Sequence, residues 1–221
     1  MAGTRRTRQD SRREYTRRSL IETAESMFGT LGIDSVSLRQ IGSAAGSANA
    51  NVVGYHFGTK EDLILAIFRH RLPWLDQRRG QLHDKLTLEH ASLRLEHLVY
   101  AMWYPLFEQV DDNGDHTFAG FLAELIRTGR GEIRRSVNID YPQTDRLASG
   151  IRQDFPEKTR HIVDHRMGIV TAIVTAQLRF IDQQRADGDS DSGKAKILFL
   201  DSLRMASAAL SAPIDQSTLP G

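Results

Sequence analysis

Cysteine is absent from this chain of 221 residues. Its absence excludes a disulfide framework, a zinc ribbon and a thiol nucleophile, and it is typical of a reducing compartment. The chain also lacks any apolar run near the roughly 18 residues that a membrane span needs, and its basic N-terminus lacks the apolar stretch of a secretory signal. With 40% hydrophobic and 26% charged residues, the composition is typical of a soluble globular protein. We expect a cytoplasmic protein without membrane contact.

Acidic residues are scarce at the N-terminus. Residues 1–18 contain seven arginines against Asp10 and Glu14, a balance of +5, whereas the whole chain carries only +1. A basic arm on a mildly acidic body indicates a polyanionic partner, although a disordered solubilising tail has the same composition. We expect residues 1–16 to form a basic, flexible arm.

Strand patterns are also rare, because the alternation of apolar and polar residues never lasts for more than a few positions. Helical spacing dominates instead, and the sequence predicts an all-α fold. The first helix is expected over residues 17–28, whose apolar positions follow one helix face. Ser37 and Gln40 form the capping-box pattern of a second, short helix, which Gly46 ends.

A third helix is predicted to start near residues 47–49 and to end at Val53 or Gly54, and a fourth starts at the capping-box pattern of Thr59 and Asp62. Pro73 disfavours helical geometry in the residue before it, so the fourth helix is expected to end near residue 70. Further helices are predicted at 74–85, 89–110, 116–129, 157–186 and 194–211, with turn-rich separators that include residues 130–156.

Two short helices joined by a small-residue turn are the helix-turn-helix pattern. The second helix of such a pair presents short polar side chains to base edges, while its apolar side packs on the first helix. Asn49 and Asn51 fit the polar role, since an amide can pair with adenine through two hydrogen bonds, and Val52 and Val53 fit the packing role. Neighbouring side chains can donate to phosphates, which set register and affinity without reading the sequence. The predicted DNA-binding residues are Arg39, Ser47, Ala48, Asn49, Asn51, Tyr55, His56 and Lys60.

Two stretches, "LIETAESMFGTLGIDSVSLRQIGSAAG" from Leu20 and "GYHFGTKEDLILAIF" from Gly54, resemble the TetR family of bacterial transcriptional regulators. The resemblance implies a helix-turn-helix DNA-binding domain over residues 17–58 and a helical effector-binding and dimerisation domain over residues 59–221. It also implies a homodimer that binds palindromic double-stranded operator DNA, usually as a repressor, and releases the DNA when a small-molecule effector binds. Between Gly46 and Tyr55 the chain has one residue more than the commonest family spacing, so the register of the base contacts stays open by one position.

Aromatic residues of the larger domain gather on two neighbouring predicted helices. Most of them are expected in an ordinary core, but Pro105 would kink the first of these helices and can open a cavity. In the resembled family this region lines an effector pocket, usually apolar with a few polar groups, so we expect a small, largely apolar effector. The predicted ligand-binding residues are Trp74, Met102, Trp103, Tyr104, Phe107, Phe118, Phe121, Leu122 and Leu125.

The predicted helix at 157–186 is apolar on two sides. One stripe, which includes Val163, Val170 and Val174, is enough for the core of a single subunit. The second stripe indicates a partner, and in TetR-like proteins the last two long helices of each subunit form an intersubunit four-helix bundle. The predicted dimerisation residues are Ile162, Ile169, Ile173 and Phe180.

Catalytic and cofactor patterns are missing from the sequence. "GRG" at 129–131 lacks the spacing of a phosphate-binding loop, and "DDNGD" at 111–115 lacks the closing glutamate of a calcium loop. His161 and His165 are four residues apart, but no third metal ligand accompanies them. We therefore expect a protein that is not an enzyme and that has no cofactor or metal. Two alternatives stay open: a non-specific DNA-binding protein, and a small helical enzyme that acts on an apolar substrate.

Overall fold

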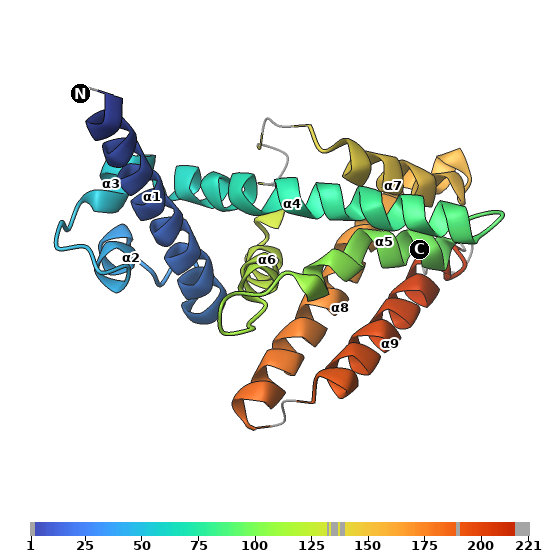
Figure 1. The fold of residues 1–221 in the computed structure, drawn as a ribbon. Coiled ribbons are helices and arrows are strands. Elements are labelled where there is room, and N and C mark those ends of the chain that lie inside the picture. The colour runs from blue at the N-terminus through green and yellow to red at the C-terminus, as the bar shows by residue number, and fades with distance from the viewer. Residues whose placement is uncertain (1–2, 132, 134–136, 138–139, 189–190, 215–221) are drawn as a thin grey trace. The chain divides into compact units, whose positions relative to one another are not determined.

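A computed structural model describes residues 3–131, 133, 137, 140–188 and 191–214. Every longer regular element in these ranges is an α-helix, which confirms the predicted all-α fold (Figure 1). The helices are α1 (Gly3–Leu31), α2 (Leu38–Ala44), α3 (Val52–Phe57), α4 (Lys60–Glu89), α5 (Leu95–Glu108), α6 (Thr117–Arg127), α7 (Pro142–Gln153), the 3-10 turn η2 (Glu157–Thr159), α8 (Arg160–Ala186) and α9 (Ser192–Ser211). Within these ranges, no helix is both long and apolar enough to cross a membrane.

The chain divides into two compact units. The first consists of Met1–Leu72 and Gly120–Ile139, and the second of Pro73–Ala119 and Asp140–Gly221. This division differs from the predicted boundary between residues 58 and 59. The first unit contains the start of α4, and it also takes most of α6, which the sequence places in the effector domain.

The core of the first unit explains why α6 belongs to it. The ring of Phe121 on α6 lies 6.3 Å from that of Phe28 on α1 and 5.5 Å from that of Phe68 on α4, measured between ring centroids. The backbones of α1 and α6 also approach closely, because a Cβ added to Gly29 would lie 2.9 Å from the carbonyl carbon of Gly120. The core of the helix-turn-helix unit is therefore completed by a segment of α6 that lies about sixty residues beyond the start of α4.

Two helix starts follow the sequence closely. The backbone N–H of Gln40 donates to Ser37 Oγ at 3.3 Å and the N–H of Ser37 donates to Gln40 Oε1 at 2.8 Å. At α4, the N–H of Asp62 donates to Thr59 Oγ1 at 3.1 Å and the N–H of Thr59 donates to Asp62 Oδ2 at 3.3 Å. Both predicted capping boxes are confirmed, because each needs only residues three positions apart.

The predicted flexible arm is helical instead. From Gly3 onward the residues expected in the arm continue α1. Arginine, glutamine and glutamate have good helix propensities, and no proline or further glycine interrupts the chain before Gly29. The structure thus places residues 3–16 in α1, where the sequence predicted a flexible arm.

Two further differences concern helix boundaries. The fourth helix was expected to end near residue 70, but α4 continues through Pro73 to Glu89, with Leu72 and Leu75 buried on either side of the exposed proline. In the predicted separator 130–156 the structure contains α7. The carboxylate of Asp76 on α4 accepts hydrogen bonds from the backbone N–H groups of Gln143 and Thr144, at 3.3 and 2.7 Å, and so caps α7 from another part of the chain.

In the second unit, α8 and α9 lie side by side as an antiparallel pair (Figure 1). Val163, Val170 and Val174 of α8 are fully buried, as is Phe199 of α9. The first predicted stripe of α8 therefore forms the core of this unit.

Candidate functional site

Helices α2 and α3 form the helix-turn-helix pair. Val52 and Val53 are buried on one side of α3, where the sequence predicts packing. The structure starts α3 at Val52 and ends it at Phe57, later than expected, so Tyr55 and His56 lie inside the helix and not after it. The predicted contacts Ser47, Ala48 and Asn49 lie in the turn before α3, and Arg39 is exposed in the first turn of α2.

The two candidate amides have different surroundings. Asn49 is hydrogen-bonded within the turn. Its Oδ1 accepts a hydrogen bond from the backbone N–H of Asn51 at 3.0 Å, and its own backbone N–H donates to Ser47 Oγ at 3.2 Å. Asn51 is exposed at the N-cap position of α3, and its side chain makes no capping hydrogen bond. A Cβ on Gly54 would lie only 2.8 Å from Asn51 Oδ1, so the glycine leaves room for this amide. Asn51 is therefore the better placed of the two amides for a base edge.

The C-terminal half of α3 carries Tyr55 and His56. Tyr55 is 69% exposed, and its ring meets that of His56 edge-on with centroids 5.2 Å apart. Burial lowers the pKa of His56 below its usual value, and the charges of Arg13 and Arg17 on α1 lower it further. The guanidinium of Arg13 lies 5.9 Å from the ring centroid of Tyr55, and that of Arg17 lies 5.1 Å from the ring centroid of Phe57. The sequence shows that Arg13 and Arg17 are one helical turn apart, but it does not indicate which residues of α3 they contact.

Lys60 has a local partner that the sequence did not indicate. Its Nζ donates to the backbone carbonyl oxygen of Ile33 at 2.9 Å, and the side chain is half-buried. The ammonium group thus joins the start of α4 to the segment between α1 and α2. A phosphate contact by Lys60 would have to share or replace this hydrogen bond.

The predicted ligand-binding residues do not gather around one cavity. Met102, Trp103 and Tyr104 of α5 are buried, and the indole nitrogen of Trp103 donates to Thr171 Oγ1 of α8 at 3.1 Å. Trp74 is exposed, Leu122 is half-buried, and Phe118, Phe121 and Leu125 are buried. Phe121 and Leu125 belong to the first unit, whereas the α5 residues belong to the second. Of the predicted set, the structure brings Phe107 to a described cavity.

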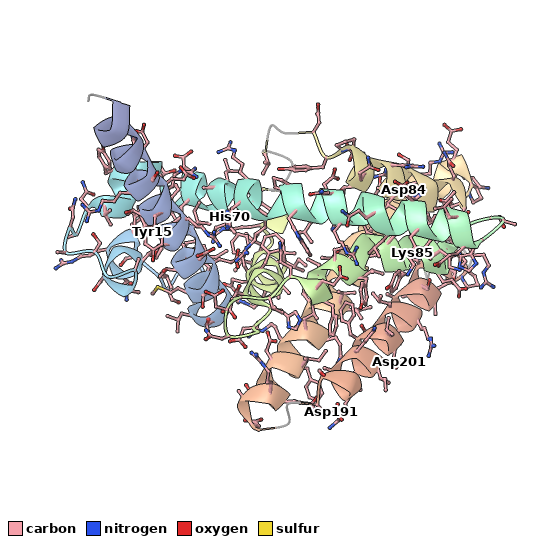
Figure 2. The ribbon with its side chains drawn as sticks, in the orientation of Figure 1. Tyr15, His70, Asp84, Lys85, Asp191 and Asp201 are labelled. Carbon is pink, nitrogen blue, oxygen red and sulfur yellow. The ribbon has the colours of Figure 1, made fainter. Side chains whose placement is uncertain are left out.

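That cavity lies in the second unit and has a volume of about 180 Å³. Its lining comes from the C-terminal end of α5, the loop before α6, the end of α8 and the start of α9, where Asp191 caps α9 (Figure 2). Phe107, Val110 and Ile181 supply apolar surface. The ring of His116 is fixed in the wall, because Nδ1 lies 2.6 Å from Asp182 Oδ1 and Nε2 lies 3.1 Å from the carbonyl oxygen of Phe107. Periodicity alone could not identify these residues, since they come from four separate elements.

The second stripe of α8 lies away from the core of its unit. Ile169 and Phe180 are 47% and 54% exposed, and Ile162 and Ile173 are half-buried. On the adjacent helix α9, Ile197 and Met205 are also exposed. The pair α8 and α9 therefore carries large apolar side chains toward solvent on both helices.

The fold and the exposed edge of α3 define a helix-turn-helix DNA-binding protein. Residues 20–67 match the family model described as bacterial regulatory proteins, tetR family, and this match covers α2, α3, the C-terminal part of α1 and the start of α4. Over these residues the chain is similar to the DNA-binding domain of the TetR family of transcriptional regulators. A comparison with curated proteins gives no match.

Proposed function

We propose that the protein is a homodimeric, cytoplasmic repressor that binds a palindromic operator through α3 and leaves it when a small, largely apolar molecule binds the second unit. The observation that carries the DNA-binding role is the position of Asn51. Its exposed amide stands at the start of α3 with no capping role, while Val52 and Val53 anchor the opposite side of the helix. An amide in this position can pair with adenine through two hydrogen bonds.

Selection of duplexes from a random pool tests the role of Asn51. The wild-type protein should enrich a palindrome, because a two-fold symmetric dimer places two recognition helices one DNA turn apart. Asn51→Ala should lose preference at one base pair in each half-site, by about 1 to 3 kcal/mol. Tyr55→Phe is the comparison variant: its effect should be equal on every duplex, because a phosphate contact carries no sequence information. Equal binding of palindromic and scrambled duplexes by the wild-type protein would favour a non-specific DNA-binding protein instead.

The cavity beside Phe107 supports the effector role. Its apolar wall of Phe107, Val110 and Ile181 suits a small organic molecule, and the volume of about 180 Å³ limits the ligand to a compact one. Ligand binding would favour an arrangement of the two subunits in which their two α3 helices no longer fit successive major grooves of the operator. Operator affinity would then fall by the ratio of the ligand's affinities for the two states.

A thermal-shift screen of small apolar compounds, followed by operator release, tests this role. Ala195→Phe should abolish the hits by filling the cavity, because Ala195 is part of its lining. Leu88→Phe, at an exposed position near the end of α4, is the matched control and should keep them. Compounds that stabilise both variants equally would place the effector elsewhere, and turnover of a bound compound would favour an enzyme.

The exposed face of α8 and α9 supports the dimer. Monomeric proteins rarely expose several large apolar side chains on adjoining helices. Ile169 and Phe180 on α8 and Ile197 and Met205 on α9 fit a bundle in which each subunit contributes two helices.

A further inference from the structure

Helix α1 is longer than the helix-turn-helix domain requires. The family match starts at residue 20, and the buried side chains of α1 also start there, with Leu20. Among the side chains described between residues 10 and 19, none is buried, and Tyr15 is 76% exposed (Figure 2). The segment before Leu20 therefore adds about seventeen residues of helix without adding to the core.

Two contacts hold this N-terminal half of α1 against α3. Arg13 and Arg17 are one turn apart on α1, and their guanidinium groups lie over the rings of Tyr55 and Phe57, at 5.9 and 5.1 Å from the centroids. Cations in this position are attracted by the faces of aromatic rings. Arg13 and Arg17 are four residues apart on α1, and Tyr55 and Phe57 are two residues apart near the end of α3. Each guanidinium group therefore meets one of the two rings.

The same contacts bring positive charge to the DNA-reading surface. Arg13 stands beside Tyr55, an exposed side chain expected to contact phosphate. The charges of Arg13 and Arg17 extend to the interior of α3, where they help to lower the pKa of His56. Arg18 is partly neutralised by Glu22, with a distance of 2.8 Å between Nε and Oε1, whereas Arg12 is exposed. Over residues 1–18 the sequence has seven arginines against two acidic residues.

We propose that the N-terminal half of α1 is a second DNA-contacting element, a rigid helix that binds the phosphate backbone beside the groove that α3 reads. This inference rests on the proposed DNA-binding function and adds the geometry of a second contact. Because the helix exists before DNA binds, the arginines do not have to be ordered on binding, as those of a flexible tail would. Each phosphate contact should add about 0.9 to the salt dependence of the affinity, expressed as the slope of log K against log salt concentration.

Thr16→Pro tests the rigid helix without changing the charge. Thr16 lies between Arg13 and Arg17, and proline there removes an N–H, so it disfavours helical geometry in Tyr15 and releases the residues before it. Thr16→Ala is the matched control and keeps the helix. At low salt we expect Thr16→Pro to bind the selected duplex and a scrambled duplex about tenfold more weakly than Thr16→Ala, with a shallower salt slope. Equal affinity and equal slope for the two variants would overturn the proposal, because a flexible polycation tolerates the proline.

A second pair of variants covers the case in which Thr16→Pro does not fold. Arg12→Gln and Arg13→Gln each remove one charge from neighbouring positions, but Arg13 is the one placed over Tyr55. The proposal expects the larger loss of affinity from Arg13→Gln and its recovery in Arg13→Lys, with unchanged melting temperatures. Equal losses in Arg12→Gln and Arg13→Gln would contradict it. If Thr16→Ala bound no DNA at all, the proposed function itself would fail, and this result is distinct from every outcome above.

Discussion

The carboxylate of Glu25 accepts two hydrogen bonds from the guanidinium of Arg71, at 2.7 and 2.8 Å, inside the first unit. Glu25 is fully buried on α1, and Arg71 comes from α4. A buried carboxylate is costly without its cation, so this pair joins α1 to α4 in one arrangement.

Loss of the cation should therefore destabilise the protein strongly. We expect Arg71→Met to lower the free energy of unfolding by about 3 to 5 kcal/mol, because it leaves Glu25 buried without its cation. Arg18→Met removes the exposed pair with Glu22 and should cost less than about 1 kcal/mol. Urea unfolding at neutral pH measures both. Similar costs for the two variants would mean that the buried carboxylate finds another partner.

Gly29 and Gly120 predict opposite effects of the same substitution. Gly29→Ala should destabilise the first unit by about 1 to 3 kcal/mol, because its Cβ would lie 2.9 Å from backbone atoms of α6. A Cβ on Gly120 would lie 3.7 Å from Gly29 Cα, an ordinary contact, and alanine favours the helix by up to about 1 kcal/mol. Thermal unfolding of the two variants is the test. A stable Gly29→Ala protein would show that α1 and α6 can separate without loss.

The lowered pKa of His56 predicts that DNA binding depends on pH. In the free protein the pKa lies below the usual 6.5, owing first to burial and then to Arg13 and Arg17. DNA phosphates would offset the arginine charges and raise this pKa in the complex. The state with the higher pKa is favoured at low pH, so affinity should rise as the pH falls below neutrality and level off below the free-protein pKa. His56→Gln should remove this part of the pH dependence in anisotropy titrations; an unchanged profile would assign it to another group.

The lowered pKa of His56 has the opposite effect on the pH dependence of folding stability. Because the folded-state pKa of His56 lies below its unfolded value, the stability it contributes is present above pH 6.5 and is lost as the pH falls toward the folded-state pKa. The pH range for the binding experiment should therefore be checked by circular dichroism.

The exposed stripe of α8 predicts a mutant that dissociates. Ile169→Glu should yield a monomer, since a carboxylate at the proposed interface would lose hydration without gaining a partner, at a cost of several kcal/mol, roughly 2 to 5. Leu88→Glu, on an exposed apolar residue of α4, should stay dimeric. Sedimentation measures the oligomeric state. Operator affinity should fall with the dimer, because one subunit has one recognition helix; a dimeric Ile169→Glu protein would move the interface away from α8.

Local signals in the sequence were sufficient to identify the helix-turn-helix motif, although α3 lies later in the chain than predicted. The capping boxes at Ser37 and Thr59 depend on residues three positions apart, and the buried side of α3 depends on the adjacent valines. The family match over residues 20–67 rests on the same short segment. The all-α class could also be predicted, because the helical spacing of apolar residues can be read from the sequence.

Tertiary contacts decided the features that depend on distant partners. The N–H of Ile33 donates to Glu124, 91 residues away, and Phe121 packs on Phe28, so α6 joined the first unit against the predicted domain boundary. Asp76 caps α7 across 68 residues to Thr144, where proline and turn formers in the sequence had indicated a loop. The environments of Lys60 and Arg13 likewise depend on other elements of the fold. The sequence by itself thus determined the helical class of the fold and the capped starts of α2 and α4, because these depend on residues within one or two helical turns of each other. Only the tertiary structure decided which helices share a core and which polar side chains remain open to a ligand, because those contacts join positions that no local pattern relates.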